Sequence, residues 1–147
     1  MLTVRNEAEI IERCLEAAGP DVDAVLLADT GSDDDTVAIA EQCCAKLGKP
    51  LRMVRHEWCD FGHNRTLTFQ AAVEYASSLG WDLETSWAFA QDPDMVWRPK
   101  LPMKSWMSQN PYHDAYILQQ TNIGMEYQNL RMLRLSLPER LKTNIAS

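Results

Sequence analysis

Two aspartates separated by a single residue, Asp92 and Asp94, lie just after a short apolar segment, residues 87–90. Pro93 favours an extended backbone at the residue before it, and in an extended chain the two carboxylates point the same way. Neighbouring carboxylates repel each other unless a cation lies between them. Mg²⁺ and Mn²⁺ bind carboxylate oxygens together with phosphate oxygens. This Asp-x-Asp pair therefore predicts a site for Mn²⁺ or Mg²⁺, and the alternative is a solvated turn.

Polar side chains also follow the other apolar segments that the sequence predicts to be strands. They are Arg5 and Glu7, then Asp29 and Thr30, and then Arg65 on the first turn of a helix. The carboxyl ends of parallel strands lie at one edge of a sheet, where such folds bind ligands. We therefore expect one site there, with Arg65 on phosphate oxygens and Asp29 accepting a hydrogen bond from a base or ribose. Turn and capping roles for the carboxylates, and a surface position for Arg65, are the alternatives.

The elements that must position these residues alternate between strand and helix. Strands are predicted at residues 2–4, 24–28, 51–55 and 87–90, with amphipathic helices between them. Right-handed crossovers turn this order into a mostly parallel sheet with helices on both faces, which is a Rossmann-like α/β fold.

The boundaries of the helices follow from capping residues. Asn6 is expected to cap the first helix, and Ser32 with Asp35 is expected to cap the second. The third helix is expected from about residue 64 to residue 79. A short helix and a pair of antiparallel strands are predicted between residues 103 and 133.

The composition predicts one domain that binds neither nucleic acid nor a bilayer. The chain has 147 residues, enough for a hydrophobic core, and its formal net charge of -7 repels phosphate backbones. Its longest apolar run, residues 24–28, is far too short to span a membrane. The four cysteines form no Cys-x-x-Cys pair and no signal peptide is visible, which favours a cytoplasmic protein.

Several common nucleotide and catalytic motifs are absent from the sequence. No Gly-x-Gly-x-x-Gly follows the first predicted strand, and neither the phosphate-binding loop of the common NTPases nor a Gly-x-Ser-x-Gly elbow occurs. A nucleotidyltransferase of similar sheet architecture would carry a Gly-rich loop where residues 5–7 read Arg-Asn-Glu. What remains is a nucleotide site built from carboxylates and a metal ion.

Four segments in this order resemble the motifs of family 2 glycosyltransferases. They are residues 4–11 with Cys14 and Leu15, residues 29–36, residues 58–61 with Asn64 and Arg65, and residues 91–95. The second segment carries Asp35 where the family commonly has glycine. The resemblance spans residues 2–97, and beyond it only residues 128–134 are similar to the family.

The resemblance implies a GT-A fold and an inverting transfer of a sugar from a nucleoside-diphosphate sugar to an acceptor that the sequence does not name. It also implies that Thr3, Arg5, Asp29 and Thr30 line the nucleoside, while Asp92 and Asp94 hold the ribose, the diphosphate and a metal ion. The catalytic base is not assigned. Its candidates are the downstream carboxylates Asp114, Glu126 and Glu139.

Residues 1–147 are expected to form a single domain with a complete donor side and an incomplete acceptor side. The chain alone is therefore expected to transfer sugar poorly. The alternative is a catalytically silent module that binds nucleotide sugars and needs a partner for its acceptor site.

Overall fold

The first half of the chain folds around a parallel sheet. The computed structural model describes residues 1–138. The strands β1 (Leu2–Val4), β2 (Val25–Asp29) and β3 (Leu51–Arg55) follow one another across the sheet in that order. All of β2 is buried, as its uninterrupted apolar sequence predicts for a central strand covered on both faces.

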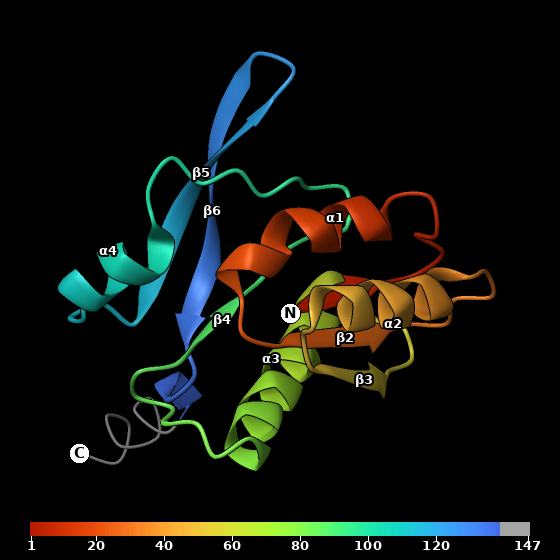
Figure 1. Cartoon of the computed structure of the whole chain (residues 1–147), viewed down its shortest axis with the longest axis horizontal. Helices are drawn as coiled ribbons and strands as arrows, with labels where there is room; N and C mark the ends of the chain where they lie inside the picture. The colour runs from red at the N-terminus through yellow and green to blue at the C-terminus, as the bar shows by residue number, and fades with distance from the viewer. Residues whose placement is uncertain (139–147) are drawn as a thin grey trace.

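Helices cover both faces of this sheet (Figure 1). Two of them, α1 (Ile11–Ala18) and α2 (Thr36–Leu47), pack on one face and share a core with Val25 and Leu27 of β2. The third, α3 (Phe61–Ser78), crosses the opposite face against β1 and β2. The short helix η1 (Gly19–Asp21) follows α1 directly.

A second sheet is antiparallel and has the order β4-β6-β5. Its strands are β4 (Trp87–Phe89), β5 (Ala115–Asn122) and β6 (Met125–Arg134), and α4 (Met103–Gln109) precedes β5. Two hydrogen bonds join the sheets: the Met1 nitrogen donates to the Phe89 carbonyl at 2.7 Å, and the Gln91 N–H donates to the Met1 carbonyl at 3.1 Å. This pattern is that of parallel neighbours, so β4 lies beside β1 and the order across both sheets is β3-β2-β1-β4-β6-β5.

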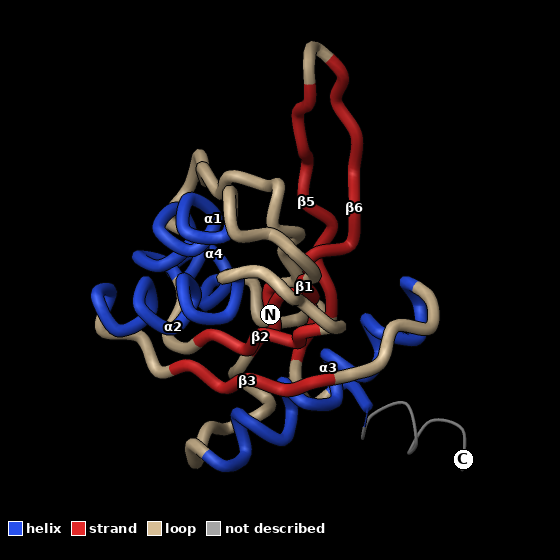
Figure 2. Tube along the Cα trace, turned by 90° about the vertical axis from the view of Figure 1, so that its right-hand side faces the viewer, coloured by secondary structure: helices blue, strands red, loops and turns tan. Residues whose placement is uncertain are grey.

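The predicted α/β architecture, with helices on both faces and a C-terminal antiparallel pair, is confirmed. The fourth strand differs from the prediction in its main partner, because β4 pairs antiparallel with β6 over its full length. Beyond that pairing, β5 and β6 continue as a hairpin that projects from the body of the molecule (Figure 2). Its turn has positive φ at Ile123 and Gly124, 44° and 78°.

The side-chain caps predicted for the first two helices do not form, although Asp35 does hold the N-cap position of α2. The first helix, α1, begins at Ile11 with no side-chain cap. Asn6 instead accepts a hydrogen bond from the Asp33 N–H at 2.9 Å, and its own N–H donates to Ser32 Oγ at 3.0 Å. The two residues therefore tie the loops after β1 and β2 to each other at the carboxyl edge of the sheet. In front of α2, Thr36 N–H donates to Asp34 Oδ1 at 2.9 Å.

The third helix begins earlier than predicted, at Phe61, because Asp60 caps it. Asp60 Oδ1 accepts a hydrogen bond from the His63 N–H at 2.8 Å, and this bond lowers the pKa of the Asp60 carboxyl. Within residues 1–138, no helix is both long enough and apolar enough to span a bilayer.

Candidate functional site

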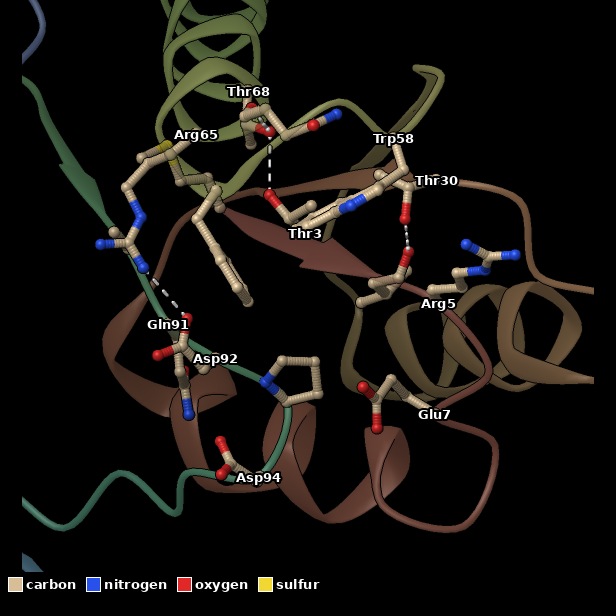
Figure 3. A pocket seen from close by; sticks show the side chains of 16 residues that line it. Thr3, Arg5, Glu7, Thr30, Trp58, Arg65, Thr68, Gln91, Asp92 and Asp94 are labelled. Carbon is tan, nitrogen blue, oxygen red and sulfur yellow. Dashed lines mark hydrogen bonds and ion pairs between the residues drawn. The ribbon is translucent and has the colours of Figure 1, made fainter.

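A pocket of about 540 Å³ lies at the carboxyl edge of the sheet, where the strand order reverses between β1 and β4 (Figure 3). Open α/β sheets bind ligands at this point, and the volume is typical of small-molecule sites. The loops after β1, β2 and β4 and the first turns of α3 form its walls. Every predicted site residue except Asp29 lines it: Thr3, Arg5, Glu7, Thr30, Arg65, Asp92 and Asp94.

Asp92 is held between two arginines from distant parts of the chain. Arg65 Nη2, from the first turns of α3, lies 3.3 Å from one carboxylate oxygen, and Arg131 Nη2, from β6, lies 2.8 Å from the other. The two differ in burial: the Arg65 side chain is 50% exposed and that of Arg131 only 5%. Arg65 can therefore reach a ligand in the pocket, whereas Arg131 fixes the aspartate from behind.

Arg131 was not among the predicted site residues. Its guanidinium also donates to Gln120 Oε1 at 3.2 Å and to the Ala90 carbonyl at 3.4 Å. Gln120 Nε2 in turn lies 3.0 Å from the Met95 sulfur. These contacts connect the β5–β6 hairpin to both ends of the Asp-x-Asp segment.

Asp94 has free carboxylate oxygens. Its side chain is exposed, lines the pocket, and makes no hydrogen bond or ion pair with another described residue. Glu7 lines the same pocket, and its pKa is raised, first by burial and then by the negative charges of Asp94 and Asp34. The negative charges of Glu7 and Asp94 therefore repel each other on this side of the pocket.

Thr3 and Thr30 lie on the side of the pocket away from Asp92 in the view of Figure 3. The two hydroxyl oxygens of Thr3 and Thr68 are 3.0 Å apart, and Thr30 Oγ1 donates to the Val4 carbonyl at 3.0 Å. Both hydroxyls are thus held in place by neighbouring elements and keep an oxygen that can accept a hydrogen bond. Arg5 is exposed beside them.

Asp29 does not reach the pocket. It is 1% exposed, its Oδ1 accepts a hydrogen bond from the Ser32 N–H at 3.0 Å, and its Oδ2 lies 3.7 Å from Arg55 Nε. In this conformation it shapes the loop after β2, which is the turn-forming alternative for this residue.

The loop before α3 and the first residue of that helix bring two aromatic side chains to the pocket, Trp58 and Phe61. The fully buried Asn64 anchors this loop, because its side chain accepts from the Cys59 N–H and donates to the Glu57 carbonyl, both at 2.9 Å. Residues 58–61 belong to a segment that resembles a family motif, but the resemblance predicted no role for either aromatic ring.

The candidate catalytic bases lie elsewhere. Asp114 forms an ion pair with Arg134 at 3.0 Å, and Glu126, on the projecting hairpin, accepts from Gln119 Nε2 at 2.6 Å. Neither lines the pocket. Glu139 lies outside the described residues.

A larger cavity, of about 790 Å³, is lined by α3 and by the segments around the starts of β2 and β4. Its walls are mostly apolar, with Tyr75, Trp81 and Trp87 among them. The charged side chains at its rim already have partners: Lys104 is 2.6 Å from Asp23, and Arg134 pairs with Asp114. The carboxyl-edge pocket is therefore the better candidate for a charged ligand.

Comparison with known proteins agrees with this geometry. A sequence profile of the family described as Glycosyl transferase family 2 matches residues 1–143. A TPR repeat-containing protein of Synechococcus elongatus is 41% identical over 73 residues, which are 49% of this chain and 17% of that protein. The crystal structure of S. aureus TarS, residues 1–349, superposes with a TM-score of 0.60 at 14% identity, covering 96% of this chain and 48% of that one.

The structural likeness confirms the GT-A-like fold that the sequence resemblance implied. The profile match covers nearly the whole chain and includes all four segments that line or border the pocket. This protein therefore belongs to glycosyl transferase family 2.

Proposed function

We propose that the carboxyl-edge pocket binds a nucleoside-diphosphate sugar, and that residues 1–147 act as the donor-binding domain of an inverting glycosyltransferase. The observation that carries this proposal is the placement of Arg65, Asp92 and Asp94 together at the strand-order reversal of a family 2 chain. In the proposed complex the diphosphate lies against Arg65. The nucleoside extends along Thr3, Arg5 and Thr30, with Asp29 ordering the loop behind it.

The pocket fits a divalent metal ion only with help from the ligand. Within residues 1–138, no three His, Cys, Asp or Glu side chains gather closely enough to hold a metal by themselves. Asp94 offers free oxygens, and Asp92 offers oxygens that arginines already contact. We propose that these two aspartates and the donor phosphates together bind Mn²⁺ or Mg²⁺, which supplies positive charge where the leaving diphosphate becomes more negative.

The proposed transfer is a single displacement at the anomeric carbon. An acceptor hydroxyl forms a bond to that carbon on the face opposite the diphosphate, while the bond to the diphosphate oxygen breaks. A base takes the proton from the hydroxyl. Arg65, which contacts the diphosphate, stabilises the charge on the leaving group.

A second candidate function is donor binding without transfer. It is favoured by the two described base candidates, since Asp114 and Glu126 have partners of their own and lie outside the pocket. A partner chain or further segment would then complete the acceptor site. The cytoplasmic location stays a prediction from the sequence, which does not name the acceptor.

Nucleoside-diphosphate binding is expected to depend on divalent metal. Removing the metal leaves the diphosphate facing Asp92 and Asp94 without a bridging cation, so affinity for UDP or GDP should fall by about tenfold or more. A ligand that binds only the folded state raises the melting temperature. Thermal-shift measurements on a panel of nucleotide sugars, each with Mn²⁺ and with EDTA, therefore identify the donor. Isothermal titration then gives the affinities.

Asp94→Asn should reproduce the effect of EDTA, since it removes the free carboxylate from the pocket. Asp33→Asn is the matched control, because Asp33 is exposed and lies outside the pocket. Equal affinity with and without metal, in both the parent and Asp94→Asn, would reject the metal. Absence of binding by every nucleotide sugar would reject the donor site itself.

A further inference from the structure

Two large aromatic side chains at the pocket remain exposed to solvent. The exposed fraction is 42% for Trp58 and 80% for Phe61. Their ring centroids are 4.9 Å apart at an interplanar angle of 86°, so the edge of one ring meets the face of the other. Because exposed apolar surface beside a polar pocket marks a binding surface, these rings are candidates for ligand contact.

The loop that carries Trp58 is anchored by hydrogen bonds. Asn64 is 1% exposed and bonds to both Cys59 and Glu57, which flank Trp58. At the other end of the loop Asp60 caps α3, directly before Phe61. The rings are therefore presented in a fixed place before a ligand arrives, which lowers the entropy lost on binding.

The position of Trp58 selects the part of the ligand that it contacts. Figure 3 shows Trp58 beside Thr3 and Thr30, on the side of the pocket away from Asp92 and Asp94. If Arg65 and the aspartates hold the diphosphate, the nucleoside and the sugar of the donor extend from it in opposite directions. The nucleobase is the flat, aromatic end, and an indole face stacks on any base.

We propose that Trp58 stacks on the nucleobase of the donor and that Phe61 supports the indole by its edge contact. This inference rests on the proposed function and adds to it a specificity-determining surface. Stacking on Trp58 gives nucleoside diphosphates a higher affinity than inorganic pyrophosphate, which has no base. It discriminates little among bases, because every base has an aromatic face.

The test compares UDP with inorganic pyrophosphate by isothermal titration in the presence of Mn²⁺. Trp58→Ala should weaken UDP binding by about 5- to 100-fold, the effect of removing one base–aromatic stack. Pyrophosphate binding should change by less than about twofold, since its contacts lie at the other side of the pocket. Trp58→Phe should keep most of the affinity for UDP. Tyr112→Ala is the control, because Tyr112 is 89% exposed and lines neither cavity.

Each other outcome overturns the inference. If Trp58→Ala binds UDP as tightly as the parent chain, the ring does not contact the base. If it weakens UDP and pyrophosphate equally, the substitution has damaged the phosphate side of the pocket. If it weakens only nucleotide sugars and leaves UDP unchanged, Trp58 contacts the sugar. If the parent chain binds no nucleoside diphosphate, the proposed function fails first, and that result is seen without any variant.

Discussion

Arg65→Gln should weaken the binding of nucleoside diphosphates by about 10- to 100-fold, because a charge-assisted hydrogen bond is worth about 1.5–3 kcal/mol. Arg65 is the exposed one of the two arginines on Asp92, so it is free to turn toward a phosphate. Stability should change little, since an ion pair that is half exposed contributes at most about 1 kcal/mol. Isothermal titration with UDP at low ionic strength measures the loss, and added salt should reduce it.

The matched control is Arg13→Gln, which makes the same charge change on an exposed position of α1, outside the pocket. This control separates a local contact from the effect of net charge, which already stands at -7. Equal losses in the two variants would show that Arg65 acts only through the overall charge. An unchanged affinity in Arg65→Gln would remove Arg65 from the site.

Arg131→Met should lower the free energy of unfolding by about 3 kcal/mol, the low end for breaking a buried ion pair. The low end applies because the Asp92 side chain is 41% exposed and can be hydrated after the change. The loss also leaves Gln120 and the Ala90 carbonyl without their bonds to the guanidinium. Urea denaturation measures the change. Arg98→Met, at an exposed position, should stay within about 0.5 kcal/mol of the parent chain.

A double-mutant cycle with Asp92→Asn separates the ion pair from the packing of Arg131. The two substitutions should be non-additive in unfolding free energy and in UDP affinity, because each removes the same contact. Additive losses would mean that Arg131 supports the hairpin alone and does not position Asp92.

The sequence predicted the carboxyl edge of the parallel sheet well because local patterns determine it. The buried run of β2 and the amphipathic α1 and α2 are periodicities of neighbouring residues, and each places polar residues at a strand end. Once the strands are parallel, the segments after β1, β2 and β4 must meet at one edge. Seven predicted residues came together there for that reason.

Contacts between distant segments could not be predicted in this way. Arg131 is 39 positions from Asp92, and no spacing rule connects a β6 residue with the end of β4. Asn6 and Ser32 are residue types that often cap helices, but here each forms a hydrogen bond with the other loop. The sequence alone does not show this contact. Asp29 is the last residue of the buried strand β2. An aspartate there faces either a ligand or its own loop, and only the backbone path decides between the two.

Photo-crosslinking can show directly where a nucleotide binds on this chain. The 4-thiouridine analogue of UDP, irradiated on the protein with Mn²⁺ and mapped by mass spectrometry of the digested chain, should label peptides from the loop after β1 or from the Trp58 loop. An excess of UDP should prevent the labelling. Labelling at residues that line the larger cavity, such as Tyr75 or Trp81, would show that the nucleotide binds there and not at the carboxyl-edge pocket.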